Sequence, residues 1–455
     1  METLENKPKR VGPLIAAVGL GVLLNPLNTT MISVALARLQ EYFEVGFEEI
    51  SWLIATYYLA SAIANPIMGK LSDSYGRKRF FLIGLLLVTL SSLLAPFSTS
   101  FGMLLAFRTV QAIGTSAVFP SGMAIVRQAA GEKQARAFGY LAMFTSGAAA
   151  LGPSVGGLLL DAGDWPALFA INFPIIAASF ILILKVVPPD AKRGAARPKI
   201  DVWGMLWFSA AVCFILMFLL SLEKTPAWWT LAGVAVSAWL FYRVENRAAE
   251  PFIKLDVMIR NLGVLRVNTH YILANLIYYS IVFGMPIYYQ TVYDLTPSQS
   301  GLAMLALAIP NVMSGPIASR LVERAGVRIT IILGSAVNFI GGIILALQGD
   351  NAPLAAIILN MALFGFSAGM LNVSLQQALY MHVAKRDTGV ASGLFMNARF
   401  FGSMMSSSLL GFVFHEAVSP SRLKVMAVCC AVIGVMMVLL ALRQKARERL
   451  PEADA

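Results

Sequence analysis

Long apolar runs separated by short polar gaps occupy almost the whole chain. Fourteen of these runs approach or exceed the length of about 20 mostly apolar residues that a helix needs to cross a bilayer. They lie at residues 12–37, 50–69, 80–97, 101–126, 137–160, 166–187, 203–221, 227–243, 265–290, 300–320, 328–348, 353–380, 389–414 and 423–442. The pattern therefore predicts an all-α integral membrane protein with fourteen transmembrane helices.

Basic residues fall in every second gap between the apolar runs. Most of the 35 Lys and Arg residues lie in eight segments: Lys7–Arg10, Lys70–Arg79, Arg127–Arg136, Lys185–Lys199, Arg243–Arg266, Arg320–Arg328, Lys385–Arg386 and Arg443–Arg449. Loops rich in Lys and Arg remain on the cytoplasmic side of a membrane. Because the number of runs is even, we expect a multi-pass protein of the cell membrane with both termini in the cytoplasm.

Composition agrees with a surface that faces lipid. Hydrophobic residues make up 58% of the chain and charged residues 13%, and the mean hydropathy is +0.72, whereas a soluble domain is about one quarter charged. The net charge of +11 follows from topology, so no nucleic-acid partner is expected. The first run is too long and too polar for a cleaved signal peptide, and we interpret it as the first span.

The chain also repeats itself at a constant offset of 250 residues. Residues 66–76 realign with residues 316–326, and the matching positions include Lys70 with Arg320, Asp73 with Glu323, and Gly76 with Gly326. Two parallel six-helix repeats, related by an axis along the membrane normal, are an architecture of transporters. Chance similarity between two amphipathic turns is the alternative to a true repeat.

The spacing of the repeat leaves the seventh and eighth helices between two six-helix halves. We therefore predict a first half at residues 1–187, a linker with two inserted transmembrane helices at 188–243, and a second half with a cytoplasmic tail at 244–455. The two halves are expected to be pseudo-symmetric. Pro188–Lys199 is rich in Pro, Lys, Arg and Ala and is interpreted as the linker.

Six short motifs follow one another along the runs: Gly69–Arg79, Arg108–Gly114, Gly147–Gly157, Asp201–Gly204, Glu245–Pro251, and Gly389–Gly393 followed by Arg399. In these motifs the chain resembles the major facilitator superfamily, and specifically its fourteen-helix drug/proton antiporter branch. The resemblance implies a secondary active transporter that exports small amphipathic compounds or drugs by alternating access, coupled to protons. One departure concerns the first helix, where the branch usually has Asp and this chain has Asn28.

Arg108 is the strongest candidate for a functional side chain. It lies about eight residues into an apolar run, where a charge is costly unless it faces a polar or wet interior. Gln111 and Thr115 follow at i+3 and i+7, so the three side chains share one helix face. Either Arg108 marks the substrate and coupling pathway, or it anchors neighbouring helices by binding backbone carbonyls.

Other polar residues within the runs are candidates for the same cavity. Asn25 and Asn28 are neighbours on the unusually polar first run, and buried amides in a membrane need partners. Binding and packing remain alternative roles for these two and for the candidates of the second half, which are Asn275, Tyr278, Asn372, Gln376 and Arg399.

The acidic residues complicate the prediction of proton coupling. All 24 Asp and Glu residues lie in gaps, in the tails or near predicted helix ends, whereas proton-coupled transporters commonly need a buried carboxylate that titrates. Two hypotheses follow. Coupling uses a peripheral acid such as Asp161, Asp164 or one of Glu41–Glu49, or the substrate is itself anionic or zwitterionic and supplies the negative charge.

Two glycine-containing motifs are predicted to form helix contacts. The candidate cytoplasmic gate consists of Gly69, Asp73, Gly76, Arg77, Glu323 and Gly326. The resemblance implies that this contact holds the inner side shut while the outer side is open, and a plain topogenic loop is the alternative. Small residues and a kink predict close packing for the helix-five signature, which consists of Gly147, Gly152, Pro153, Gly156 and Gly157.

Other classes of protein are less well supported by the sequence. An enzyme is not expected, because no buried acid, base or metal-ligand cluster is found; neither a cofactor nor a metal is expected. Two alternatives to drug efflux remain, namely an exporter of an anionic or zwitterionic molecule with altered coupling, and a receptor or assembly factor built on a transporter scaffold. The expected partners of the transporter are a small-molecule substrate, protons and the lipid bilayer, and the protein is expected to be a monomer.

Overall fold

The computed structural model describes residues 11–130, 134–190, 201–221, 226–247, 261–348, 352–383, 388–415 and 417–443. Helices account for nearly all of these residues. They are α1 (Val11–Val22), α2 (Leu24–Phe43), α3 (Phe47–Tyr75), α4 (Arg77–Leu94), η1 (Ala95–Phe97), α5 (Phe101–Ala130), α6 (Gln134–Gly163), α7 (Ala167–Ala170), α8 (Asn172–Val186), α9 (Val202–Ser221), α10 (Trp229–Glu245), α12 (Leu262–Val292), α13 (Pro297–Ala303), α14 (Leu305–Ala325), α15 (Val327–Leu347), α16 (Leu354–Met381), α17 (Thr388–Phe414) and α18 (Pro420–Leu442).

The all-helical prediction is confirmed. Each apolar run predicted from the sequence coincides with one helix or with two or more consecutive short ones. Within the described residues, 10 candidates are long and apolar enough to cross a membrane. The count of fourteen spans and the two-helix insertion stay predictions. Residues outside the described ranges include the predicted linker beyond residue 190, residues 248–251 of the fifth motif, and both ends of the chain.

Proline explains why the first predicted run forms two helices. The ring of a proline inside a helix clashes with the carbonyl four residues earlier, and for Pro26 that residue is Val22. The structure ends α1 at Val22 and begins α2 at Leu24, with Leu23 between them. The chain nevertheless continues in the same direction, since Leu27 N still donates to Leu23 O at 3.0 Å.

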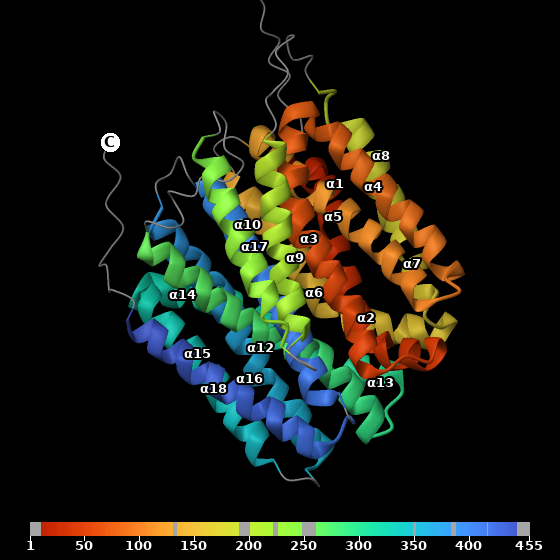
Figure 1. Cartoon of the computed structure of the whole chain (residues 1–455), viewed down its shortest axis with the longest axis vertical. Helices are drawn as coiled ribbons and strands as arrows, with labels where there is room; N and C mark the ends of the chain where they lie inside the picture. The colour runs from red at the N-terminus through yellow and green to blue at the C-terminus, as the bar shows by residue number, and fades with distance from the viewer. Residues whose placement is uncertain are drawn as a thin grey trace, which may run out of the picture.

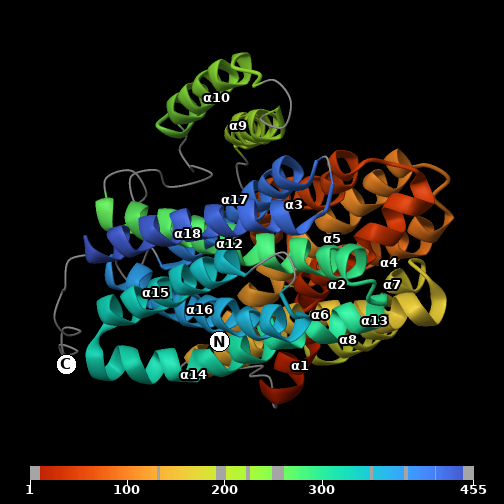
Figure 2. The same cartoon turned by 90° about the horizontal axis from the view of Figure 1, so that it is seen from below.

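The helices gather in two groups that lie side by side, α1–α8 and α12–α18 (Figure 1). We call them the first and second groups. Helix α9 packs against α10, and α9 also contacts α3 and α17. Seen from below, the α9–α10 pair stands apart from the two groups (Figure 2).

Reciprocal contacts join the two groups. Helix α3 packs against α17, while α6 packs against α13 and α14, and α2 packs against α12. The contact of α6 with α13 lies at the end of the bundle where α2 and α12 finish, at the bottom of Figure 1. We call this end the α13 end and the opposite one the Gly76 end, after the turn between α3 and α4.

The repeat of 250 residues reappears in the helix turns. Gly76, with φ of 117°, separates α3 from α4, and Gly326, with φ of 88°, separates α14 from α15. Positive φ values of this kind favour glycine. Two residues further on, Lys78 donates to Leu184 O at the end of α8, and Arg328 donates to Leu442 O at the end of α18. A basic side chain thus caps the negative end of the last helix in each group.

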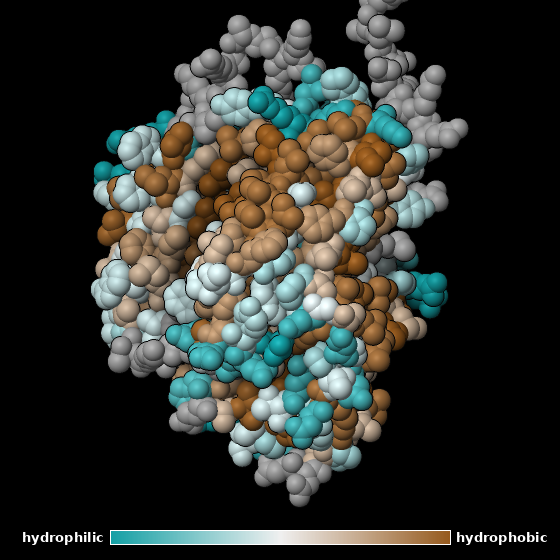
Figure 3. Space-filling model, turned by 90° about the vertical axis from the view of Figure 1, so that its right-hand side faces the viewer, coloured by the Kyte–Doolittle hydropathy of each residue, from teal (hydrophilic) through white to brown (hydrophobic). Residues whose placement is uncertain are grey.

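The outer surface is suited to lipid. On α4, Leu86, Leu90 and Leu93 are exposed at helical spacing. Figure 3 shows a broad apolar area on the side of the molecule that carries α4 and α8, with hydrophilic residues gathered at the top edge and below this area. An apolar face of this kind is stable in contact with acyl chains and not with water.

Candidate functional site

Arg108 lies inside the first group and binds main-chain and side-chain oxygens. It is 2% exposed. One terminal guanidinium nitrogen donates to Gln111 Oε1 at 2.6 Å, and both terminal nitrogens lie 3.4 Å from Asn28 O. The guanidinium carbon lies 4.4 Å from the centre of the Tyr57 ring, a cation–π distance. Among the described residues no carboxylate contacts this charge, and its Nε has no partner.

Asn28 is the centre of a polar network that joins four helices. Its amide forms a reciprocal pair with Asn172, at 2.8 Å and 2.9 Å, and its Nδ2 also donates to Leu24 O at 2.8 Å. Gln111 Nε2 donates to Asn28 Oδ1 at 3.2 Å, while Ser92 Oγ accepts from both Gln111 and Asn172. An ionised carboxylate has no hydrogen that it could donate to Leu24 O. The local structure therefore fits the amide of Asn28 and not an ionised carboxylate at this position.

Sequence reasoning missed Asn172 and Ser92. Both lie in apolar runs, and a polar residue in such a run was the available signal. A second branch of the network lies nearby, where Asn25 Nδ2 and the Tyr57 hydroxyl lie 3.1 Å and 3.0 Å from Thr115 Oγ1. The polar candidates of the first group are thus brought together, and within the described residues they largely bind one another.

Arg399 has different surroundings in the second group. It is the twelfth of the 27 residues of α17 and is partly exposed. It makes no hydrogen bond with the described residues, and its Nε has no partner there. One turn earlier on the same face, the Phe395 ring stacks on Tyr271 at 3.7 Å between ring centres. The guanidinium lies within electrostatic range of Tyr58, Tyr271 and Tyr279.

The candidate amides of the second group are partly open. Asn372 and Gln376 are both exposed on α16, one turn apart. Asn372 Oδ1 accepts a hydrogen bond from the Tyr271 hydroxyl of α12 at 2.9 Å, so its exposed surface lies on the α12 side of α16. Tyr278 accepts from Asn311 at 3.1 Å. Asn275, in contrast, is buried and donates to Tyr271 O of its own helix.

Aromatic rings bridge the two groups beside these residues. The Tyr58 ring of α3 lies 5.5 Å from Tyr279, 6.3 Å from Phe283 and 6.1 Å from Phe400, measured between ring centres. These distances fall in the range of favourable aromatic pairs. The interior between the groups is therefore lined by tyrosine and phenylalanine rings close to Arg399.

The helix-five signature lies on α6 and forms two close contacts. A Cβ at Gly152 or Gly156 would collide with Thr30 or Met31 of α2. A Cβ at Gly157 would collide with the carbonyl oxygen of Pro297, on α13 of the other group. Only Gly147, among these four glycines, has no neighbour within 4 Å of an added Cβ.

On the α13 side of this contact, a glycine likewise lies against a main-chain carbonyl oxygen of the other group. A Cβ at Gly301 would lie 2.5 Å from the carbonyl oxygen of Pro153. The hydroxyl of Ser154 donates to Gly301 O at 2.8 Å. Two further hydrogen bonds join the groups, from Gln290 Nε2 to Val34 O at 3.0 Å and from Ser407 Oγ to Ser51 O at 2.9 Å. All three hydrogen bonds lie toward the α13 end.

The contacts that the structure describes for Arg77 and Gly69 of the candidate gate, at the Gly76 end, lie within the first group. Arg77 forms an ion pair with Asp73 at 2.9 Å and lies 3.3 Å from Gln128 Oε1 of α5. The candidate Gly69 faces Pro120, also on α5, at 3.4 Å from an added Cβ.

The second-half counterpart of this gate differs. Glu323 is exposed and forms no ion pair with the residues that the structure describes. Gly326 has open space around an added Cβ. The equivalent turns are therefore alike in backbone and different in side-chain contacts.

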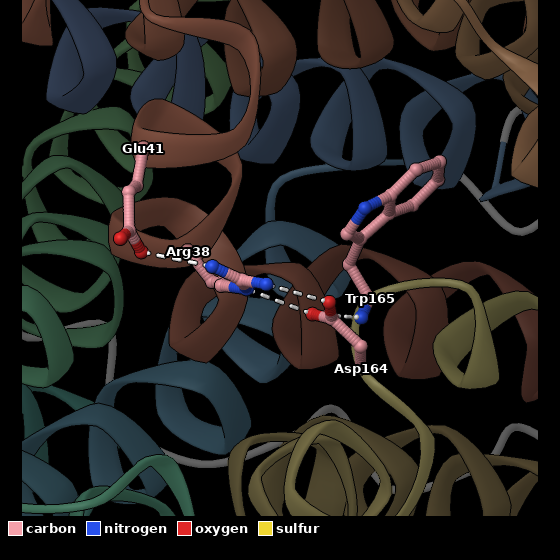
Figure 4. Close-up of polar contacts among 4 residues, drawn as sticks. All are labelled: Arg38, Glu41, Asp164 and Trp165. Carbon is pink, nitrogen blue, oxygen red and sulfur yellow. Dashed lines mark hydrogen bonds and ion pairs between the residues drawn. The ribbon is translucent and has the colours of Figure 1, made fainter.

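An ion-pair cluster ties α2 to the turn after α6 (Figure 4). Arg38 binds both oxygens of Asp164, at 3.1 Å and 2.9 Å, and Glu41 Oε2 at 2.9 Å. Asp164 also accepts from Trp165 N at 2.7 Å. The Arg38 guanidinium is the main cause that lowers the pKa of Asp164 below its ordinary 3.8. The other candidate peripheral acid near this turn, Asp161, is exposed.

A bundle of apolar helices in two reciprocally packed groups, with a buried arginine inside one group and exposed amides in the other, is the architecture of a membrane transport protein. The chain belongs to the Major Facilitator Superfamily, whose profile matches residues 18–407. Members of this superfamily are transporters and not enzymes, and this chain is therefore a multi-pass membrane transporter of a small molecule.

Similar proteins agree with this assignment. The chain is 36% identical over 434 residues to the uncharacterized MFS-type transporter YwoD of Bacillus subtilis (strain 168), which covers 94% of this chain and 96% of that protein. It is 29% identical over 408 residues to the multidrug resistance protein Stp of Mycobacterium tuberculosis (strain CDC 1551 / Oshkosh), covering 88% and 75% of the two chains. A bacterial homologue of the human lysosomal transporter Spinster, solved in an inward-facing and unoccupied conformation, shares the fold with a TM-score of 0.67 and 14% identity over 94% of this chain and 95% of that one.

Proposed function

We propose that this transporter exports small amphipathic compounds from the cell by alternating access, driven by proton antiport. In this proposal the Gly76 end faces the cytoplasm, as do both termini, and the protein acts as a monomer in the cell membrane. Residues 1–187 and 244–455 are the two moving halves, and residues 188–243 carry the linker and the inserted helices.

The observation that carries the proposal is the one-sided contact between the groups. The close contacts of Gly157 with Pro297 and of Gly301 with Pro153 lie toward the α13 end. The three hydrogen bonds described above between the groups lie toward the same end. Asn372 and Gln376 keep exposed polar surface within a long apolar helix. This combination supports a state that is closed outside and accessible from the cytoplasm, as in the inward-facing Spinster homologue.

The chemistry of the interior supports an amphipathic cargo. Tyrosine side chains combine an apolar ring and a hydroxyl group, and Tyr58 and Tyr279 lie buried against each other at the boundary of the two groups. Several relatives are named multidrug resistance or drug efflux proteins, which favours compounds of this type. Asn28, Arg108 and Gln111 are proposed to hold the first-half wall of the cavity.

For proton coupling we propose the peripheral acids beside Arg38. Asp164 and Glu41 both contact this guanidinium, so a movement of α2 relative to the turn after α6 would change their electrostatic environment. This contact lies at the end that must open toward the outside.

Everted membrane vesicles provide the test. They are energised, and collapse of the pH gradient is followed by a fluorescent amine dye as lipophilic cations, neutral compounds, zwitterions and organic anions are added. We expect saturable collapse with at least one class, absent from vesicles without the protein and abolished in vesicles carrying Gly157→Ala. Uptake of a labelled compound without any proton flux would refute antiport and retain transport, while no flux of any compound would favour the receptor or assembly-factor alternative.

A further inference from the structure

Two arginines, Arg108 and Arg399, lie in the interior of the bundle, and among the described residues only Arg108 has hydrogen-bond acceptors. Arg108 is 2% exposed and binds oxygens of Asn28 and Gln111. Arg399 retains exposed surface and makes no hydrogen bond with the described residues. A guanidinium has five N–H donors and no way to lose its charge in a protein. A cation in the middle of a membrane helix without an acceptor is unfavourable, and such residues mark binding sites or pathways.

The residues around Arg399 offer hydrogen bonds and rings but no negative charge. Asn372 lies on the same side through its hydrogen bond to Tyr271, and Gln376 is exposed one turn away. No Asp or Glu lies in the middle of α12, α16 or α17. Within the part of the chain that the structure describes, these three helices thus offer Arg399 no counter-charge, and a bound anion would supply one.

We propose that Arg399 forms the anionic subsite of the transport cavity and that the transported compounds include amphipathic aromatic carboxylates. The two parallel N–H groups of a guanidinium match the two oxygens of a carboxylate. The Tyr58, Tyr279 and Phe400 rings, which are buried against one another at the boundary of the two groups, form the apolar side of this subsite. The exposed amides Asn372 and Gln376 bind its remaining polar groups. This inference rests on the proposed function for the statement that the bound compound is carried across.

Binding to the purified full-length protein in detergent tests the subsite without transport. The probes are 2-naphthylacetate, 2-naphthylacetamide and 2-(2-naphthyl)ethylamine, which share one ring system and carry a negative, zero and positive charge. Their dissociation constants are measured by equilibrium dialysis of labelled compounds. We expect the carboxylate to bind the wild-type protein about 10-fold or more tightly than the amide, as a hydrogen bond to a charged group implies.

Variants of Arg399 test whether this residue causes the preference for the carboxylate. Arg399→Gln is expected to remove the preference for the carboxylate, and Arg399→Lys to restore part of it as a point charge. Binding of the neutral amide should change less than about twofold in both, which shows that the cavity is still folded. Arg243→Gln is the matched control, because Arg243 lies exposed on α10 against Trp239 and not in the cavity.

Three outcomes overturn the anionic subsite: the amine binds best to the wild-type protein, the carboxylate preference survives Arg399→Gln, or the carboxylate does not bind. Vesicle flux separates this result from the proposed function. Export of the amide without a carboxylate preference refutes the subsite and retains export. A carboxylate preference in binding, with no flux of any probe, retains the subsite and refutes export.

Discussion

The interiors of the two halves use their polar residues in opposite ways. In the first half, Asn28, Asn172 and Gln111 bind one another and surround Arg108. In the second half, Asn372 and Gln376 are exposed, and Arg399 has no hydrogen bond to the described residues. A satisfied polar network makes a rigid and unique core, whereas open polar groups are ready to bind a ligand. The comparison suggests one half that serves as a fixed wall and one that recognises the substrate.

Replacement of the two arginines tests this difference directly and should give the largest effect. Arg108→Ala leaves the buried Gln111 Oε1 without its guanidinium donor, at about 1–3 kcal/mol, and also removes the guanidinium from Asn28 O and from the Tyr57 ring. Arg399→Ala removes a charge that binds no acceptor among the residues that the structure describes, so little or no loss of stability is expected. Thermal inactivation of the purified protein, followed by the loss of monodisperse material on gel filtration, measures both. Equal destabilisation by the two changes would contradict the view that the protein binds Arg108 and leaves Arg399 open.

The contact of the first half with α13 should give the next largest effect. Gly157→Ala pushes a methyl group against the carbonyl oxygen of Pro297. Overpacking of this kind costs about 1–3 kcal/mol, which shifts an equilibrium between two states by about 5- to 150-fold. We expect the α13 end to open, and labelling of Ser298→Cys by an impermeant maleimide to rise in a variant without the native cysteines.

Gly147→Ala is the matched control for this experiment. It adds the same methyl group to the same helix at a position with no neighbour within 4 Å. Its labelling rate should equal that of the parent. If both variants label alike, the close approach of α6 and α13 does not control the opening of this end.

Loss of one hydrogen bond between the halves should have a smaller effect. Ser154→Ala removes the bond to Gly301 O at 2.8 Å, and a typical net contribution is about 0.5–1.5 kcal/mol. The same labelling assay should show a rise of about 2- to 10-fold. Ser209→Ala removes a hydroxyl that binds only its own helix, through Met205 O, and should leave the rate unchanged. A rise with both serine changes would point to general loosening instead.

Loss of the ion pair between Arg38 and Asp164, near the end of α2, should have the smallest effect on stability. The positions 250 residues after Arg38 and Asp164 are Tyr288 and Phe414, so the second half has no counterpart of this pair. Because both side chains are partly exposed, Asp164→Asn should cost at most about 1 kcal/mol at neutral pH. Glu41→Gln keeps the two-oxygen contact of Asp164 with Arg38 and should cost less.

The pH dependence of this effect has a definite sign. A carboxylate with a lowered pKa stabilises the folded state above its ordinary pKa of 3.8, and this contribution is lost as the pH falls through the lower value of the folded protein. The wild-type protein and Asp164→Asn should therefore converge only in acid, as measured by thermal inactivation across a pH series. A constant difference down to strongly acidic pH would show that the charge of Asp164 is not responsible.

Much of the fold could be predicted from the apolar runs and from the glycines at the turns. The apolar runs located the helices, and the matched positions Gly76 and Gly326 proved to be equivalent turns with positive φ. These features depend on residues close together in sequence. The equivalence of Lys78 and Arg328 as helix caps was not anticipated, because their acceptors, Leu184 and Leu442, are more than 100 residues away.

The site was less predictable because its contacts join distant segments. Helical spacing placed Arg108 and Gln111 on one face, and the structure joins them by a hydrogen bond. Spacing could not find Asn172 as the partner of Asn28, 144 residues away. It also could not tell that Asn372 is open while Asn275 is bound to its own helix, since both are single amides in apolar runs.

The approach of α6 to α13 has a mechanical consequence. The atoms in contact there are main-chain atoms of Pro153, Gly157, Pro297 and Gly301. Main-chain atoms within a helix have no rotamers to exchange, so the contact cannot loosen gradually by rearranging side chains. In the proposed alternating-access cycle, this contact would act as a hard stop: the closing movement would end at a position set by covalent geometry, whichever compound is carried.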